Sequence, residues 1–392
     1  MKEKYKYYLL TFIRYLGDSF FYPFFALYLH TKDSIGESKI GILIAITPFI
    51  GIIANPIFSK ICKNFRILKN VLGVIGIIEA VVICVLLKAD NFYTLLIFTI
   101  LLSLFGSCHY GLFDSLLTIF SKENNINYSN IRVWGSIAYI VGTILAGVVI
   151  KKFEYDLSFY ICAFCFFLAS FLYFILKPIY KGDKIEEKRN FKAILKNKEF
   201  ILYLIFYMLF YGVLKTSNNY YSLLLESRGL SSVVYGQNYA LFVFVEVVLL
   251  IIFDKINKKL NYKVLLGLAI VSLTIMSFVN ASKLPSIILI IFSMLRGVSW
   301  GIALHVSNKV IVSLLGLKNT TLGTMMLDLC YSIVVIIINT SGGYIIEGTS
   351  YNMFYLILAA IASIDAIFYF VFVRKYICVN DELDVRKETI EA

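Results

Sequence analysis

Long apolar stretches alternate with short polar connections along almost the whole chain. Twelve of these stretches come close to the roughly 20 residues that a helix needs to cross a lipid bilayer. They cover residues 7–30, 38–59, 68–88, 91–120, 131–150, 157–178, 199–225, 234–253, 264–282, 285–307, 320–345 and 351–373. The pattern therefore predicts an all-α integral membrane protein with 12 transmembrane helices.

Composition supports the same class of protein. Of the 392 residues, 59% are hydrophobic and only 16% are charged, whereas a soluble chain carries about a quarter charged residues. The first stretch is longer than a signal-peptide core and holds Arg14 and Asp18. We therefore expect it to remain in the protein as a membrane span.

The basic residues indicate how the chain is oriented. Most of the 37 Lys and Arg lie at the N-terminus, in every second connection and in the C-terminal tail. Because cytoplasmic connections carry an excess of Lys and Arg, both termini are predicted to be cytoplasmic. We expect a multi-pass monomer in the cell (plasma) membrane, the inner membrane of a bacterium. The net charge of +12 is concentrated in these connections and does not indicate nucleic-acid binding.

One long, highly charged connection divides the chain. It reads "KGDKIEEKRNFKAILKNK" and follows the sixth apolar stretch. We expect four parts: an N-terminal six-helix bundle at 1–179, a cytoplasmic linker at 180–198, a C-terminal six-helix bundle at 199–376 and a cytoplasmic tail at 377–392.

The two halves repeat each other. The segment Ile57–Lys63, "IFSKICK", is similar to Ile252–Lys258, "IFDKINK", and each follows the second stretch of its half. Parallel six-helix repeats are the signature of the major facilitator superfamily, whose members bind solutes near the membrane midplane. The repeat predicts this fold, with two pseudo-symmetric halves.

Ionisable side chains inside the apolar stretches are candidates for function, because a charge in the bilayer is costly. The cations are Arg14, Arg132, Lys215 and Arg296, and the acids are Asp18, Glu79, Asp114, Glu246, Asp328 and Asp365. Arg14 and Asp18 are four residues apart and can pair on one helix face. A second structural pair is expected between Lys215 and Asp328. Glu79 and Asp365 are expected to be protonated or hydrogen-bonded structural residues.

Two polar stripes run along neighbouring stretches at helical spacing. The fourth stretch carries Ser103, Ser107, Tyr110, Asp114, Thr118 and Ser121, and the fifth carries Arg132, Ser136, Tyr139 and Thr143. Arg132 follows Asp114 by 18 residues across a short connection, so antiparallel helices bring both to a similar depth. We expect Arg132 to be the cation that stabilises the Asp114 carboxylate.

Three segments carry a resemblance to a known family. "FFYPFFALYLH", "SKIGILIA" and the arginine-led "RVWGS" resemble the lactose-permease-like branch of the major facilitators, which includes nucleoside and phenylpropionate carriers. The resemblance implies that Asp114 and Arg132 bind hydroxyl groups of the solute and that Tyr139 stacks on its ring. Tyr110 and Ser136 lie on the same polar stripes and join this expected binding set.

The C-terminal half matches this branch less well. Glu246 resembles the acid that the branch has on its eighth span, but Arg296 and Ser299 stand where the branch has a His and a proton-carrying Glu. A cation near Glu246 favours its ionised form and so makes Glu246 a poorer proton carrier. Asp18 is therefore the first candidate for proton coupling and Glu246 the second. Glu246 and Arg296 are also expected to bind substrate, together with Asn218 and Asn219 on the seventh span.

The predicted function is secondary active transport of a small polar solute, with proton-coupled uptake of a saccharide or related polyhydroxy compound favoured. A carboxylate accepts hydrogen bonds from hydroxyl groups and a guanidinium donates to hydroxyl oxygens. The alternatives are a nucleoside or aromatic-acid proton symporter and a drug efflux carrier. A membrane enzyme is disfavoured, because His30, His109 and His305 are scattered along the chain. Neither a metal nor a cofactor is expected.

Overall fold

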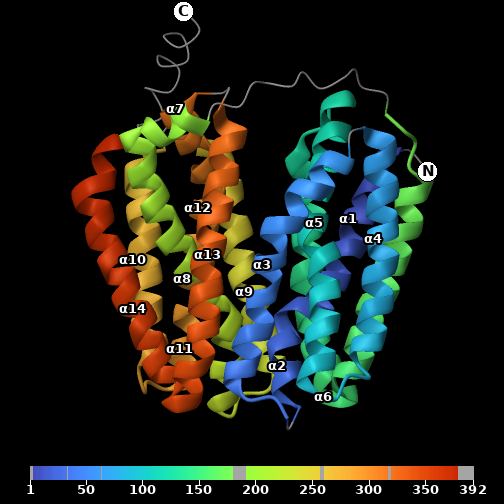
Figure 1. Ribbon diagram of the computed structural model, residues 1–392, viewed down its shortest axis with the longest axis horizontal. Helices are drawn as coiled ribbons and strands as arrows, with labels where there is room; N and C mark the ends of the chain where they lie inside the picture. The colour runs from blue at the N-terminus through green and yellow to red at the C-terminus, as the bar shows by residue number, and fades with distance from the viewer. Residues whose placement is uncertain are drawn as a thin grey trace, which may run out of the picture. The chain divides into compact units, whose positions relative to one another are not determined.

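A computed structural model of the chain describes residues 3–32, 34–62, 64–179, 191–256, 260–316 and 319–377. Within these ranges the secondary structure is helical throughout and contains no strand (Figure 1). Most of the predicted linker, at 180–190, and nearly all of the predicted tail, at 378–392, lie outside the described residues.

The helices begin and end close to the apolar stretches of the sequence. Their bounds are α1 Glu3–Phe21, η1 Tyr22–Phe24, α2 Phe25–His30, α3 Glu37–Ile61, α4 Phe65–Leu86, α5 Phe92–Glu123, α6 Tyr128–Ile175, α7 Phe191–Lys196, α8 Lys198–Ser227, α9 Ser232–Ile256, α10 Tyr262–Ala281, α11 Ser286–Phe292, α12 Met294–Leu315, α13 Thr320–Gly348, α14 Tyr351–Phe368, η4 Tyr369–Val373 and η5 Arg374–Tyr376.

Twelve membrane crossings account for these helices. Ten segments of the described chain are long and apolar enough to span a bilayer. One of them, α6, has 48 residues, which is about 72 Å of helix and enough for two crossings. Glu154 interrupts it with φ 65° and ψ −173°, between the two predicted spans. The first crossing is α1, continued through the turn at Pro23 into α2.

Asparagine and serine side chains fix where several helices begin. Asn64 Oδ1 accepts a hydrogen bond from the Ile67 N–H at 2.9 Å, and Asn91 Oδ1 accepts one from the Thr94 N–H at 3.0 Å. Each bond satisfies a backbone donor that the first helical turn leaves open. These caps start α4 and α5, the helices that carry Glu79, His109 and Asp114.

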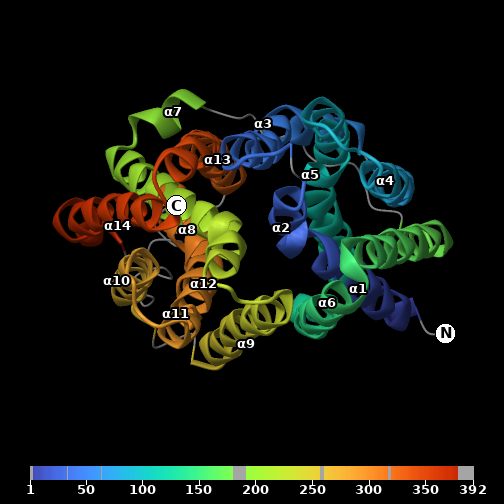
Figure 2. The same cartoon turned by 90° about the horizontal axis from the view of Figure 1, so that it is seen from below.

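The described chain forms two compact units. Unit 1 comprises Met1–Lys184, Asn219–Val243 and Asn339–Glu347, and unit 2 comprises Ile185–Asn218, Phe244–Ile338 and Gly348–Ala392. In unit 1, α1 packs on α6, α4 packs on α5 and α6, and α3 packs on α5 (Figure 2). In unit 2, α10 packs against α12 and α14.

Helix ends from both sequence halves meet inside unit 1. A Cβ atom on Gly41 of α3 would lie only 2.6 Å from the Asn339 carbonyl oxygen of α13, and one on Gly147 of α6 would lie 2.6 Å from the Ser232 carbonyl oxygen of α9. These two glycines therefore permit a backbone approach that any other residue would block. The result is one tightly packed end of unit 1, built from α2, α3, α6, α8, α9 and α13.

Candidate functional site

The polar stripes of α5 and α6 come together in unit 1 around two tyrosines. Tyr128 donates a hydrogen bond to Asp114 Oδ1 at 2.9 Å. The Arg132 guanidinium carbon lies 4.3 Å from the centre of the Tyr15 ring, a cation–π distance. Asp114 and Arg132 are each half-buried. The arrangement offers an acceptor and a donor that are not sealed inside the helix packing.

Aromatic rings extend this group along the same two helices. The ring centres of Tyr139 and Tyr239 are 5.7 Å apart and the rings are inclined by 32°. Tyr110 lies 6.4 Å from the Tyr15 ring and 6.2 Å from the Tyr22 ring, centre to centre. Both Tyr139 and Tyr110 are half-buried, as is Ser136 one turn before Tyr139. Such faces suit a flat ring or the apolar face of a sugar.

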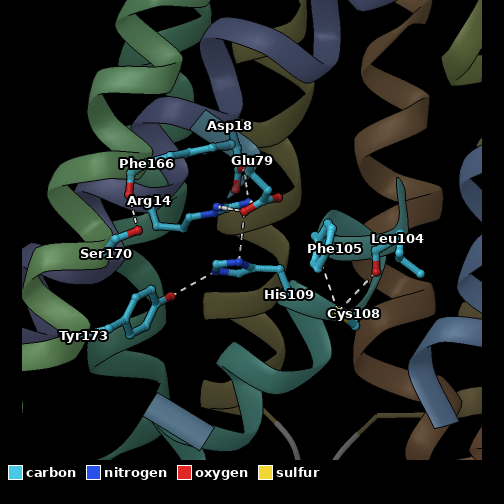
Figure 3. A network of polar contacts seen from close by, with 10 residues as sticks. All are labelled: Arg14, Asp18, Glu79, Leu104, Phe105, Cys108, His109, Phe166, Ser170 and Tyr173. Carbon is cyan, nitrogen blue, oxygen red and sulfur yellow. Dashed lines mark hydrogen bonds and ion pairs between the residues drawn. The ribbon is translucent and has the colours of Figure 1, made fainter. Parts of the chain in front are cut away.

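A second group of charged side chains in unit 1 is fully buried. Arg14 of α1 donates two hydrogen bonds to Glu79 of α4, from Nη1 to Oε2 at 2.6 Å and from Nη2 to Oε1 at 3.1 Å (Figure 3). Arg14 Nη2 also lies 3.1 Å from Asp18 Oδ1, so the pair expected from the sequence is present. The Phe166 ring covers the guanidinium, whose carbon is 3.7 Å from the ring centre.

His109 of α5 joins this buried group. Its Nδ1 lies 3.2 Å from Glu79 Oε2, and its Nε2 shares a hydrogen bond of 3.0 Å with the Tyr173 hydroxyl (Figure 3). The side chains of Asp18, Glu79 and His109 have 0% exposure and that of Arg14 has 1%. We call Arg14, Asp18, Glu79 and His109 the buried charge cluster.

Unit 2 holds the predicted site residues Asn218, Glu246 and Arg296. Arg296 of α12 is fully buried and donates from Nη1 to Asn218 Oδ1 of α8 at 3.1 Å. A Cβ atom on Gly301 of α12 would lie 3.3 Å from the Glu246 carbonyl oxygen, so α9 and α12 approach closely beside Glu246. Asn219 belongs to unit 1, where its amide donates to Asn339 Oδ1 at 3.3 Å.

No three His, Cys, Asp or Glu side chains gather as a metal site would need within the part of the chain that the structure describes. The chemistry available to these groups is hydrogen bonding, charge pairing, ring stacking and proton binding.

Comparison with known proteins identifies the family. The sequence profile of the MFS_1-like family matches residues 4–357, which is nearly the whole chain. The chain belongs to the MFS_1-like family. The resemblance seen in the N-terminal sequence motifs is therefore confirmed at the level of the family, and the protein is a multi-pass membrane protein of the major facilitator type.

Two curated relatives of this MFS_1-like chain are transporters. The uncharacterized transporter YwbF of Bacillus subtilis (strain 168) is 24% identical over 219 residues, 55% of each chain. The maltose permease of Geobacillus stearothermophilus is 22% identical over 222 residues, 56% of each chain. The MFS_1-like chain thus spans about half the length of the curated relatives it matches.

Solved structures share the fold over almost the full length. A variant of the nucleoside transporter NupG has a TM-score of 0.83 at 15% identity, covering 94% of this MFS_1-like chain and 99% of its own. The POT family transporter PepTSo has a TM-score of 0.73 at 12% identity, covering 96% and 98%. At these identities the likeness concerns the fold, and it confirms the predicted major facilitator architecture.

One expected pair is not formed. Among the ion pairs of the described residues, Lys215 and Asp328 are not partners. Lys215 Nζ instead lies 5.4 Å from the centre of the Trp300 ring, and the Asp328 side chain is exposed. An aromatic face can stabilise a cation in this way, and the sequence gives no sign that Trp300 takes this place.

Glu79 and His109 were not expected to contact Arg14. From the sequence, Glu79 is expected to be a structural residue separate from Arg14, whereas in the structure Arg14 donates two hydrogen bonds to it. Their sequence signal is weak: each is one ionisable residue in an apolar stretch. Which span lies beside the first one depends on tertiary packing, so the partnership cannot be derived from spacing along the chain.

Proposed function

We propose that this MFS_1-like transporter imports a small polyhydroxy solute of the saccharide class, coupled to protons, by alternating access. The carrying observation is that Asp114 and Arg132 are half-buried on adjacent helices around Tyr15 and Tyr128. A carboxylate, a guanidinium and phenolic hydroxyls together match the donors and acceptors of a sugar. The likeness to a maltose permease supports this solute class.

We propose substrate-binding residues for each unit taken by itself. In unit 1 these are Asp114, Arg132, Tyr139, Tyr110, Ser136 and Asn219, and in unit 2 they are Glu246, Arg296 and Asn218. Asp18 and Glu246 remain the proposed proton-coupling residues. Both termini are proposed to lie in the cytoplasm of a plasma-membrane monomer, on the strength of the Lys and Arg distribution.

A nucleoside is the second candidate solute. Tyr139 and Tyr239 present two rings inclined by only 32°, a surface on which a planar base can stack. The fold is also that of a nucleoside transporter.

A solute panel tests the proposal. The purified protein is screened by thermal shift, and reconstituted vesicles are screened for uptake, with labelled maltose, other mono- and disaccharides, uridine, other nucleosides and aromatic acids. Saturable uptake and a rise in Tm with a saccharide support the proposal. Uptake of nucleosides without saccharides would replace it by the second candidate, and transport of aromatic acids alone would contradict both.

A further inference from the structure

We propose that Asp18 and His109 share one exchangeable proton beside the Arg14–Glu79 ion pair, and that the buried charge cluster is the proton-binding centre of the transporter. This inference rests on the proton coupling in the proposed function. It adds His109 to the residues considered for coupling, and it assigns each member of the cluster a separate part.

Charge balance in the cluster requires this proton. Arg14 keeps its charge at every accessible pH, and Glu79 neutralises it through two hydrogen bonds of 2.6 and 3.1 Å. An ionised Asp18 then adds a second negative charge at 0% exposure. An unbalanced charge in such surroundings is strongly unfavourable. One additional proton, on Asp18 or on His109, restores neutrality.

The hydrogen bonds show which groups accept the proton. Both Glu79 oxygens receive hydrogen bonds from Arg14, whereas neither Asp18 oxygen has a well-oriented hydrogen bond within the described chain. Glu79 is thus the permanent counter-ion of Arg14. Asp18 is close to Arg14 Nη2, at 3.1 Å, but it is the acid whose oxygens are available for a proton.

His109 can hold the same proton without losing a partner. In the imidazolium form both ring nitrogens are donors, and each lies near an oxygen. Nδ1 is 3.2 Å from Glu79 Oε2, an ion-pair contact without hydrogen-bond geometry, and Nε2 is 3.0 Å from the Tyr173 hydroxyl. Two arrangements therefore leave the cluster neutral. In one, Asp18 is protonated and His109 is neutral; in the other, Asp18 is ionised and His109 is an imidazolium.

The other titratable groups around Asp18 do not change this balance. They are Tyr15 on α1, Tyr22 on η1, Tyr110 on α5, and Tyr139, Tyr173, Cys162 and Cys165 on α6. Phenol and thiol groups are neutral near pH 7, so none of them supplies a further counter-charge. Release of the proton leaves the cluster with one net negative charge, which is favourable only when water reaches it.

Helix α1 connects the cluster to the proposed solute-binding residues. It carries Arg14 and Asp18 in the cluster and, between them, Tyr15, whose ring lies against Arg132. A shift of α1 that follows solute binding at Arg132 therefore also moves the proton site. This is the link that a coupled carrier needs between its two cargoes.

The experiment counts protons without any solute. Wild type, Asp18→Asn and Glu79→Gln are placed in lipid nanodiscs and titrated from about pH 8 to about pH 5, with infrared difference spectroscopy of carboxyl groups. The carboxylic-acid band of wild type should depend on pH, and either substitution should remove this dependence. In Asp18→Asn the charges of Arg14 and Glu79 balance each other without an added proton. In Glu79→Gln the charges of Arg14 and Asp18 do so.

Histidine NMR gives an independent readout. The chain has only three His, so ¹⁵N-histidine labelling yields few signals, and His109→Gln assigns one of them. His109 should gain imidazolium character as pH falls in wild type and stay neutral in Asp18→Asn. This wild-type titration also tests the proposal if a substituted protein fails to fold.

Asp365→Asn is the matched control. Asp365 of α14 is likewise fully buried, and neither of its oxygens has a hydrogen-bond partner among the described residues. This variant should keep the pH-dependent carboxyl band and the His109 titration. A pH-dependent band that survives in Asp18→Asn, or a His109 that stays neutral throughout in wild type, would overturn the proposal. Because no solute is used, failure here leaves the proposed transport function standing, and failure of the solute panel leaves this proton site standing.

Discussion

Burial divides the intramembrane charged side chains of unit 1 into two groups, for which we propose different tasks. Asp114 and Arg132 are half-buried beside tyrosines. Arg14, Asp18 and Glu79 are at most 1% exposed. A solute can reach only the first group, whereas a proton needs no more than transient contact with water. The division is the physical basis for assigning solute and proton to different residues.

Removing either charge of the first group should abolish solute binding. Asp114→Asn and Arg132→Ala each lose a charge-assisted hydrogen bond, which is worth ~1.5–3 kcal/mol or at least about a tenfold loss of affinity. Expression should remain near normal. Binding is measured by calorimetry with the solute that the panel identifies.

Ser115→Ala is the control for this experiment. Ser115 is exposed on the same helix, and its hydroxyl donates to the Gly111 carbonyl of its own turn. Its affinity should equal that of wild type. If Asp114→Asn and Arg132→Ala also bind like wild type, the assignment of the solute site to α5 and α6 is wrong.

Tyr139 should act through its ring. Tyr139→Phe keeps the face that a sugar or base contacts, so most transport activity is expected to remain. Tyr139→Ala removes the ring, and with it ~0.5–1.5 kcal/mol of aromatic contact, so affinity should fall several-fold. Uptake rates of the two variants are compared at several solute concentrations. Equal losses in both would assign the role to the hydroxyl.

Spacing along the chain predicts contacts within a helix better than contacts between helices. Arg14 and Asp18 are one turn apart, so their ion pair follows from the sequence. The bonds of Arg14 to Glu79 span 65 residues, and the contact of Lys215 with Trp300 joins α8 to α12. No periodicity encodes which helices become neighbours. The pairing of Asp114 with Arg132 stays a prediction.

At the scale of helices, the packed end of unit 1 carries a contact that depends on pH. His30, at the end of α2, lies with Nδ1 2.8 Å from Glu226 Oε2 and Nε2 3.6 Å from Glu37 Oε1. The hydrogen bond with Glu226 raises the pKa of His30 above its ordinary value. The stabilisation is therefore complete below the ordinary pKa, near 6.5, and is lost as pH rises through the raised value.

Replacing His30 should remove this pH dependence. The Tm of wild type minus that of His30→Gln should be positive at about pH 6 and shrink toward pH 8. The effect is modest, because the His30 and Glu226 side chains are 38% and 37% exposed and water screens their ion pair. His305→Gln is the control, since His305 Nε2 lies 2.7 Å from Lys309 Nζ. A constant difference across the pH range would rule out an ionised His30 as the stabilising group.

The close approach of α3 and α13 should not tolerate a side chain. A Cβ atom on Gly343 would lie 3.0 Å from Ser38 Cα and still closer to the Glu37 carbonyl oxygen, whereas one on Gly348 meets nothing within 4 Å. Gly343→Val is expected to cost ~1–3 kcal/mol by overpacking, and Gly348→Val within about 0.5 kcal/mol of zero. Thermal unfolding in detergent compares the two. Equal Tm values would show that this packed end is not tight.

The sequence predicts the helices well and their irregularities poorly. The predicted span 38–59 is α3, Glu37–Ile61, because a run of apolar residues of this length has few alternatives in a membrane. The predicted spans 131–150 and 157–178 lie in the two parts of α6, but the pattern does not predict the non-helical backbone at Glu154 that separates them. A positive φ at a glutamate is set by local packing, which the hydrophobic pattern does not encode.

At the scale of the whole molecule, the match over residues 4–357 and the shared fold place the chain among the major facilitators. The short repeat at Ile57 and Ile252 and the twelve stretches were sufficient to predict this architecture. The solute is a different matter, because related carriers reuse one fold for different cargoes. Function must therefore be tested at the residues.

The central claim is that a proton gradient drives solute accumulation through Asp18. The test uses proteoliposomes and the solute that the panel identifies. Solute accumulation is measured under an inside-alkaline pH gradient, and solute exchange is measured in loaded vesicles without a gradient. Wild type should accumulate solute only with the gradient. Asp18→Asn should fail to accumulate solute but should exchange it at a rate near that of wild type, because exchange needs no net proton movement. Accumulation by Asp18→Asn under the gradient, or gradient-independent accumulation by wild type, would contradict the account.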